Sequence, residues 1–104
     1  MTVLLGIDVG TTGVRAVAVE PGGKVVAGAS GSYGLSTPRP GWAEQDPREW
    51  WTATLEVLEA VLAEVDDGVA GIGLTGQMHG SVFLDEHGEV IRPALLWNDQ
   101  RTEA

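Results

Sequence analysis

The first group of residues that could do chemistry is Asp8 and the turn Gly10, Thr11, Thr12 and Gly13. Glycines let backbone N–H groups approach a ligand, and successive N–H groups with threonine hydroxyls can hold phosphate oxygens. A carboxylate beside such a turn can hold Mg²⁺ through water. The alternative is a hairpin whose Asp and Thr side chains only bond local backbone, and residue types alone favour that alternative.

The second group is the segment from Thr75 to Gly80, which is polar and bracketed by glycines. It follows a predicted strand, and ligands collect at the carboxyl ends of strands in α/β sheets. Gln77 and His79 offer donors and acceptors suited to hydroxyl groups. Alternatively, His79 is a turn histidine and Met78 a core residue. A zinc site formed by the two histidines of the chain is disfavoured because no third ligand accompanies them.

The third group is the segment from Trp97 to Arg101. The Trp97 ring offers a flat apolar surface of the kind that packs against sugar rings, and Asn98 or Asp99 can bond hydroxyl groups. In the alternative interpretation, Asn98 caps a helix and Trp97 belongs to the core. The two interpretations are compatible with each other.

Three strands should come first in the chain. Residues 3–9 form an apolar run typical of a central strand buried on both faces. The glycine turn then leads to a strand at 14–19, and a second turn at 21–23 leads to a strand at 24–30. We therefore predict a three-stranded antiparallel meander.

A helix should follow a loop at residues 31–45. Asp46 is suited to the N-cap, and Pro47 to the first helical position. The acidic and glycine residues at 66–68 should end the helix near residue 66. The helix should cover the sheet with an apolar stripe flanked by Trp50, Val57 and Val61. The stripe consists of Trp51, Leu55, Leu58, Leu62 and Val65.

Beyond the helix, residues 69–75 indicate a buried strand parallel to an earlier one. Residues 82–84 and 90–91 indicate a small hairpin, residues 94–97 a last strand, and Asn98 the start of a helix. The resulting β-β-β-α-β order is typical of a mixed α/β layer structure.

Composition narrows the class of protein. Of the 104 residues, 43% are hydrophobic and 20% charged, as in one globular domain, and the net charge of −9 argues against nucleic acid as a partner. The chain lacks cysteine and shows no signal peptide or membrane span, which indicates a cytoplasmic protein. Neither the P-loop nor the G-x-G-x-x-G pattern occurs.

Four segments closely resemble the start of the xylulokinases, within the sugar-kinase family that includes glycerol and gluconate kinases. They are residues 6–12, 41–47, 76–80 and 97–99, which have the family's order and fitting spacing. The first segment alone indicates only the broad actin-like ATPase superfamily. Residues 76–80 and 97–99 are more specific, because glycerol kinases carry an Arg-Glu pair where Met78 and His79 stand.

The resemblance implies a ribonuclease-H-like (actin-like ATPase) fold with two domains and a cleft between them. Residues 1–104 would be the amino-terminal part of the first domain, incomplete at the carboxyl end. The resemblance implies that the turn from Gly10 to Gly13 binds phosphate, that Asp8 helps to place Mg²⁺, and that Arg15 neutralises charge. Met78 and His79 would contact the ketopentose, with Trp97 and Asp99 near that pocket.

The implied reaction is ATP + D-xylulose giving ADP + D-xylulose 5-phosphate. In the family the general base is an aspartate well beyond residue 104, so we expect the isolated chain to be inactive. A sister kinase for another sugar or polyol, a ribonuclease-H-like nuclease and a non-catalytic sugar-binding module are the alternatives. The nuclease is disfavoured by the negative charge and by the lack of further matching acids. A homodimer is compatible with the resemblance.

Overall fold

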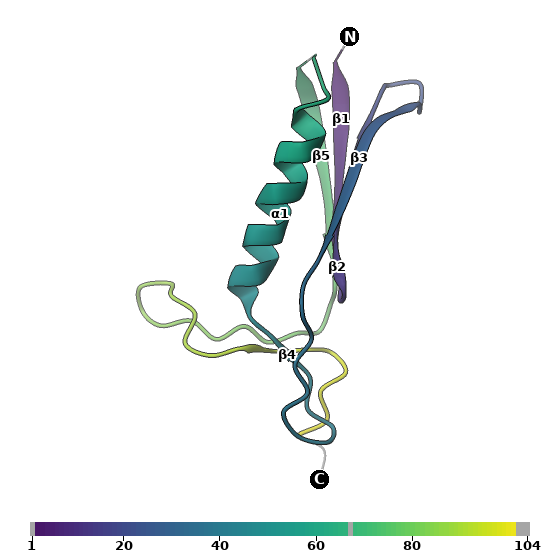
Figure 1. The fold of residues 1–104 in the computed structure, drawn as a ribbon. Helices are drawn as coiled ribbons and strands as arrows, with labels where there is room; N and C mark the ends of the chain where they lie inside the picture. Colours follow the sequence, from purple (N-terminus) through teal and green to yellow (C-terminus); the bar gives the residue numbers. More distant parts are fainter. Residues whose placement is uncertain (1, 67, 102–104) are drawn as a thin grey trace.

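The computed structural model describes residues 2–66 and 68–101 of the chain. Its elements, in chain order, are β1 (Val3–Val9), β2 (Gly13–Val19), β3 (Val25–Ser32), β4 (Glu44–Gln45), α1 (Pro47–Leu62), β5 (Val69–Gly76) and β6 (Ala94–Leu95). Figure 1 shows the helix lying along one face of a long sheet, with the segments around β4 and after β5 gathered at one end of it. Within the described ranges, no helix is long and apolar enough to cross a membrane.

The main sheet has the strand order β3-β2-β1-β5. The antiparallel pairs β1–β2 and β2–β3 form the predicted meander, and β5 lies parallel to β1. Strand β4 was not predicted, and it pairs with β6 in a separate two-stranded sheet. The predicted last strand therefore does not join the main sheet.

Helix α1 packs on β2 and β3 with a face shifted to one side of the predicted stripe, of which Leu58 and Val65 still pack against the core. The residues it buries are Ala53, Thr54, Val57 and Val61. Trp51 and Leu55, which belong to the predicted stripe, are 65% and 42% exposed. The sheet face beneath the helix is lined by small residues, including Ala16, Ala18 and Ala27. Close approach to this surface favours small and β-branched side chains on the helix.

The predicted start of the helix is confirmed, and its predicted end is wrong. The Asp46 side chain accepts a hydrogen bond from the Arg48 N–H at 3.0 Å, as an N-cap does. The helix ends at Leu62 instead of near residue 66. The Ala63 N–H still bonds the Glu59 carbonyl four residues back, whereas the N–H groups of Glu64 and Val65 bond three residues back, as in the tighter turn that often ends a helix. Asp67 lies outside the described residues.

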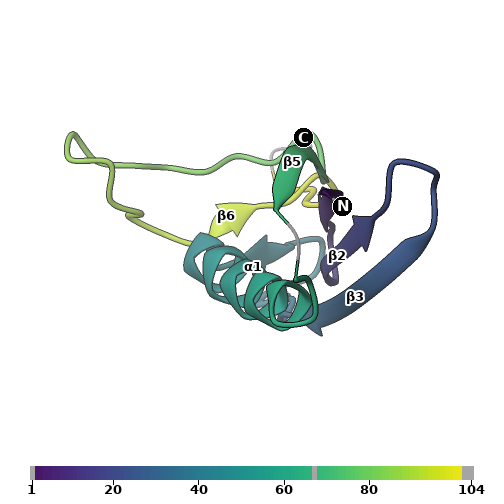
Figure 2. The same cartoon turned by 90° about the horizontal axis from the view of Figure 1, so that it is seen from above.

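Two strands predicted to be buried have an exposed face. In β1, Leu5 and Ile7 are buried, whereas Leu4 is 46% exposed and Asp8 is also exposed on the opposite face. In β5, Ile72 and Leu74 pair in register with Leu5 and Ile7, yet they are 64% and 74% exposed. The reason is that α1 covers β2 and β3, as the view from above in Figure 2 shows, and leaves β5 at the edge uncovered.

The carboxyl-terminal part has less regular structure than predicted. The hairpin expected at residues 82–91 retains its turn but only one isolated bridge, between Leu84 and Val90. Strand β6 has two residues, and no helix begins between Asn98 and Arg101 within the part of the chain that the structure describes. Side-chain contacts, described below, hold this part in place instead.

Candidate functional site

The carboxyl ends of β1 and β5 lie side by side because the two strands are parallel. The backbone N–H of Gln77 donates a hydrogen bond of 2.9 Å to the carbonyl of Val9. This bond places the turn from Gly10 to Gly13 next to the segment from Gly76 to Gly80. The structure thus brings together two of the three groups that the sequence indicated, at the edge of the sheet where ligands bind in α/β folds.

The Gly10–Gly13 turn is closed by a hydrogen bond of its own backbone and is contacted by the side chain of Tyr33. The Gly10 N–H bonds the Gly13 carbonyl at 2.9 Å, and the Tyr33 hydroxyl reaches the carbonyls of both glycines. Burial, and secondly the charge of Asp8, raises the pKa of Tyr33, so its hydroxyl keeps the proton that it donates. Tyr33 was missed because no sequence pattern in the following loop indicates a long-range contact.

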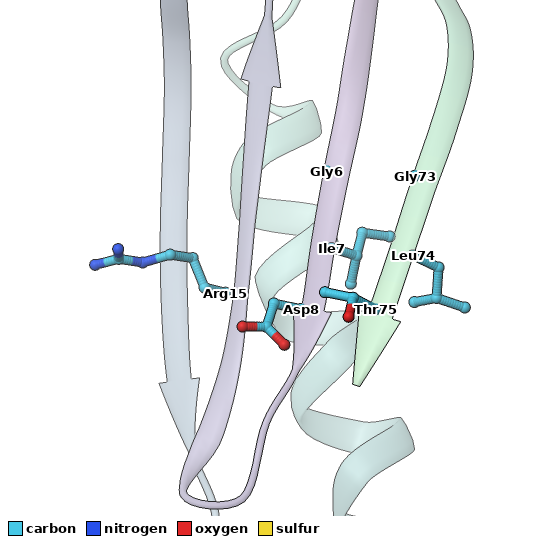
Figure 3. Close-up of a pocket in the computed structure, with 7 residues that line it drawn as sticks. All are labelled: Gly6, Ile7, Asp8, Arg15, Gly73, Leu74 and Thr75. Atoms are coloured by element: carbon cyan, nitrogen blue, oxygen red, sulfur yellow. The ribbon is translucent and has the colours of Figure 1, made fainter. Parts of the chain in front are cut away.

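Asp8 lies on the sheet face that the helix leaves open. It lines a shallow hollow of about 440 Å³, together with Thr75 and Arg15 and with Gly6 and Gly73, which have no side chain to fill it. Figure 3 shows the Asp8 carboxylate near Thr75, whereas the Arg15 guanidinium points away from it. Among the described residues no ion pair links Asp8 to Arg15, although the two are cross-strand partners.

The exposed carboxylate of Asp8 is a type of ligand that Mg²⁺ takes in proteins. Within residues 2–66 and 68–101 no cluster of three His, Cys, Asp or Glu residues could hold a metal ion. Mg²⁺ usually keeps several waters and takes one or two carboxylates plus phosphate oxygens. The exposed carboxylate of Asp8 could supply one such contact, directly or through water.

Trp97 connects the third group to the first. Its indole N–H donates a hydrogen bond of 3.1 Å to the Thr11 hydroxyl, while 56% of the residue stays exposed. Met78 is 71% exposed. His79 lines a cavity of about 260 Å³ and has a φ of 60°, the only positive φ of a non-glycine residue in the described chain. Such a backbone conformation is strained, and strained residues cluster at functional sites.

Asp99 is occupied by contacts within the protein. Its carboxylate accepts hydrogen bonds from the Ala43 N–H at 2.7 Å and from the Arg101 guanidinium at 2.8 Å. The bonds from Arg101 lower the pKa of Asp99 to about 2. Arg101 also bonds the buried Glu44 at 2.7 Å and lies 3.7 Å from the centre of the Trp42 ring. These contacts tie the carboxyl-terminal segment to β4, so a role for Asp99 toward a sugar remains a prediction.

Solved structures similar to this chain define its class. A xylulose kinase from Rhodospirillum rubrum matches with a TM-score of 0.91 and 39% identity, covering 95% of this chain and 21% of that one. A gluconate kinase from Lactobacillus acidophilus matches with a TM-score of 0.87 and 31% identity, covering 95% and 20%. The fold is therefore that of the sugar kinases within the actin-like ATPases.

The chain belongs to the FGGY family of carbohydrate kinases, because the model of that family's N-terminal domain matches residues 3–104. Among curated relatives, the xylulose kinase of Klebsiella pneumoniae is 46% identical over 98 residues, which are 93% of this chain and 20% of the relative. The chain spans about a fifth of the length of such relatives. The resemblance to sugar kinases that the sequence indicated is confirmed.

Proposed function

We propose that this chain forms one wall of the active site of a carbohydrate kinase that transfers a phosphoryl group from ATP to D-xylulose. The observation that carries the proposal is the contact between the ends of β1 and β5, where Gln77 bonds Val9. This contact brings the turn from Gly10 to Gly13, called the phosphate-type turn below, beside the polar segment from Gly76 to Gly80. The identity of the chain to xylulose kinases supports this substrate.

On the phosphate side, the N–H groups and hydroxyls of the Gly10–Gly13 turn would hold phosphate oxygens. Asp8 would hold Mg²⁺, which, when bound, neutralises charge on the phosphates. Arg15 would have to swing toward the hollow to add positive charge there. Phosphoryl transfer requires mostly positioning and charge stabilisation, and these residues supply both.

On the sugar side, Met78, His79 and Trp97 would contact D-xylulose, with Asp99 at the edge of the pocket. The residue that takes the hydroxyl proton would lie beyond residue 104, in the remainder of a two-domain kinase. Residues 1–104 would then be the first part of its amino-terminal domain, in a cytoplasmic enzyme and in one subunit of a homodimer.

A substrate panel tests the proposal. A complete kinase that contains residues 1–104 is assayed for ADP release with D-xylulose, D-ribulose, gluconate and glycerol. We expect the highest kcat/KM with D-xylulose. The similarity to a gluconate kinase supports gluconate as the second candidate. Equal or faster turnover of any other sugar or polyol would disprove the assignment to D-xylulose.

The strained backbone of His79 allows stability and sugar binding to be measured separately. His79→Gly relieves the positive φ, whereas His79→Ala keeps it, so the Gly variant should be about 1 kcal/mol more stable than the Ala variant. Both variants lack the imidazole, so both should raise KM for the sugar about tenfold, as the loss of one hydrogen bond does. Urea denaturation and steady-state kinetics check the two effects. A wild-type KM in the Gly variant would exclude His79 from the sugar site.

A further inference from the structure

Gln45 is a buried side chain that connects three segments of the site. It is 2% exposed, and its Nε2 donates a hydrogen bond of 2.5 Å to the Thr11 carbonyl in the phosphate-type turn. Its Oε1 accepts one bond from the Trp50 indole at 2.9 Å and another from Gln77 Nε2 at 3.1 Å. The Gln45 amide therefore lies between the turn and the segment that follows β5.

The partners leave only one orientation for this amide. A backbone carbonyl can only accept, so the group facing Thr11 must be the NH₂ of Gln45. An indole N–H can only donate, so the group facing Trp50 must be the Gln45 oxygen. Gln77 must then present its own NH₂ to that oxygen. Trp50 thus acts as the fixed end of a directed chain of hydrogen bonds that runs to the turn and to Gln77.

Gln77 is the member of this chain of hydrogen bonds that faces a cavity. Its Oε1 is buried and has no hydrogen-bond partner among the described residues. The same Gln77 residue lines the cavity beside His79 and Gly80. The hydrogen bond from Gln77 Nε2 to Gln45 Oε1 therefore fixes the Gln77 amide group at the wall of this cavity.

We propose that Gln45 is a positioning residue that couples the phosphate-type turn to the sugar-facing segment, so that each substrate orders the site of the other. This inference rests on the proposed function, but on its kinase class only and not on the identity of the sugar. Gln45 need not touch either substrate. It acts through the Thr11 carbonyl on one side and through Gln77 on the other.

The test uses a complete kinase containing residues 1–104 and whichever sugar it phosphorylates. Gln45→Met keeps the length of the side chain and removes all three bonds. We expect kcat to fall about 100-fold, because small misplacements of reacting groups have effects of that size. The Kd of the sugar, measured without and with a saturating non-hydrolysable ATP analogue, should lose its dependence on the nucleotide, because coupling between two binding sites is reciprocal.

A double-mutant cycle with Gln77→Met shows whether Gln45 acts through Gln77. We expect the double variant to be less impaired than the product of the two single effects, since the two residues share one bond. Multiplicative effects, or an unchanged dependence of the sugar Kd on the ATP analogue in Gln45→Met, would overturn the proposal.

Thr54→Val is the matched control, because Thr54 is a buried polar residue of α1. Among the described residues its hydroxyl bonds only the Trp50 carbonyl, at 2.6 Å. It should be destabilised without losing the coupling, and an equal loss of coupling in this variant would also overturn the proposal. If Gln45→Met does not fold, Trp50→Phe removes the N–H that orients the Gln45 oxygen and keeps a smaller aromatic ring in its place. That milder variant should lower kcat about threefold to tenfold, a loss comparable to that of one hydrogen bond, and unchanged kinetics there would count against the inference.

Discussion

Replacing Asp8 by asparagine in a complete kinase is expected to lower kcat about 100- to 1,000-fold, as removal of a group that stabilises transition-state charge does. Asparagine has the shape of aspartate without its negative charge, so the loss is electrostatic. The Mg²⁺ concentration for half-maximal rate should rise at the same time, because a weaker ligand holds the ion. Steady-state kinetics across a Mg²⁺ titration measures both effects.

The same substitution should leave the fold unchanged. Asp8 is exposed on the open face of the sheet, and exposed substitutions usually change stability by less than about 0.5 kcal/mol. Glu59→Gln, on the exposed side of α1, removes the same charge far from the hollow and should keep full activity. An Asp8→Asn variant with the kcat and Mg²⁺ requirement of the wild type would exclude Asp8 from the phosphate side of the site.

Replacing Gly13 by alanine is expected to destabilise the chain by about 3 kcal/mol, a large effect for overpacking. A Cβ atom at this position would lie 2.2 Å from the Gly31 carbonyl oxygen and 3.2 Å from the Ser32 Cα. Both are backbone atoms of β3, so relief requires the β2–β3 pair to separate next to the turn. Urea denaturation followed by circular dichroism measures the loss.

Gly28→Ala is the control for this effect. Gly28 lies in the same strand pair, opposite Val17, and a Cβ there would meet its nearest neighbours at 3.7 Å, an ordinary contact. We expect this variant to match or slightly exceed the wild type in stability, because alanine has less freedom than glycine in the unfolded chain. Equal destabilisation of both variants would show that the cause is loss of glycine in general and not the contact with Gly31.

Gly13 was selected from the sequence for its suitability to bind phosphate, and the structure adds a packing requirement at the same residue. The two roles are compatible, because the close approach of β3 brings Tyr33 to the carbonyls of the turn. A rigid turn presents its N–H groups in a fixed arrangement, which favours binding of an anion. Loss of phosphate binding in Gly13→Ala would therefore follow from the packing defect as well.

Local patterns in the sequence were sufficient for several features. The three-strand meander follows from apolar runs separated by glycine turns, and the helix start follows from Asp46 and Pro47. Each of these depends on neighbours within a few residues. The resemblance to sugar kinases also depended on short segments, and the family match over residues 3–104 confirms it.

Features that depend on distant parts of the chain were not predictable in the same way. The apolar stripe of α1 was assigned by size and spacing to large residues that include Trp51 and Leu55, but these two are exposed. The helix buries Val57 and Val61 instead, because its partner surface is rich in alanines and favours close approach by small side chains. Ile72 and Leu74 were expected to be buried because of their type, whereas burial requires a covering element that α1 does not provide for β5.

By itself, the sequence determined where the helix begins and which family the chain belongs to, because these are encoded in short segments of contiguous residues. It also predicted that the Gly10–Gly13 turn holds phosphate. Only the tertiary structure decided that the Gly10–Gly13 turn lies beside Gln77 and that the Arg15 guanidinium points away from Asp8. It also decided that Gln45 joins segments more than thirty residues apart. The physical reason is that these contacts arise from parallel pairing of β1 with β5 and from buried hydrogen bonds, which no local pattern specifies.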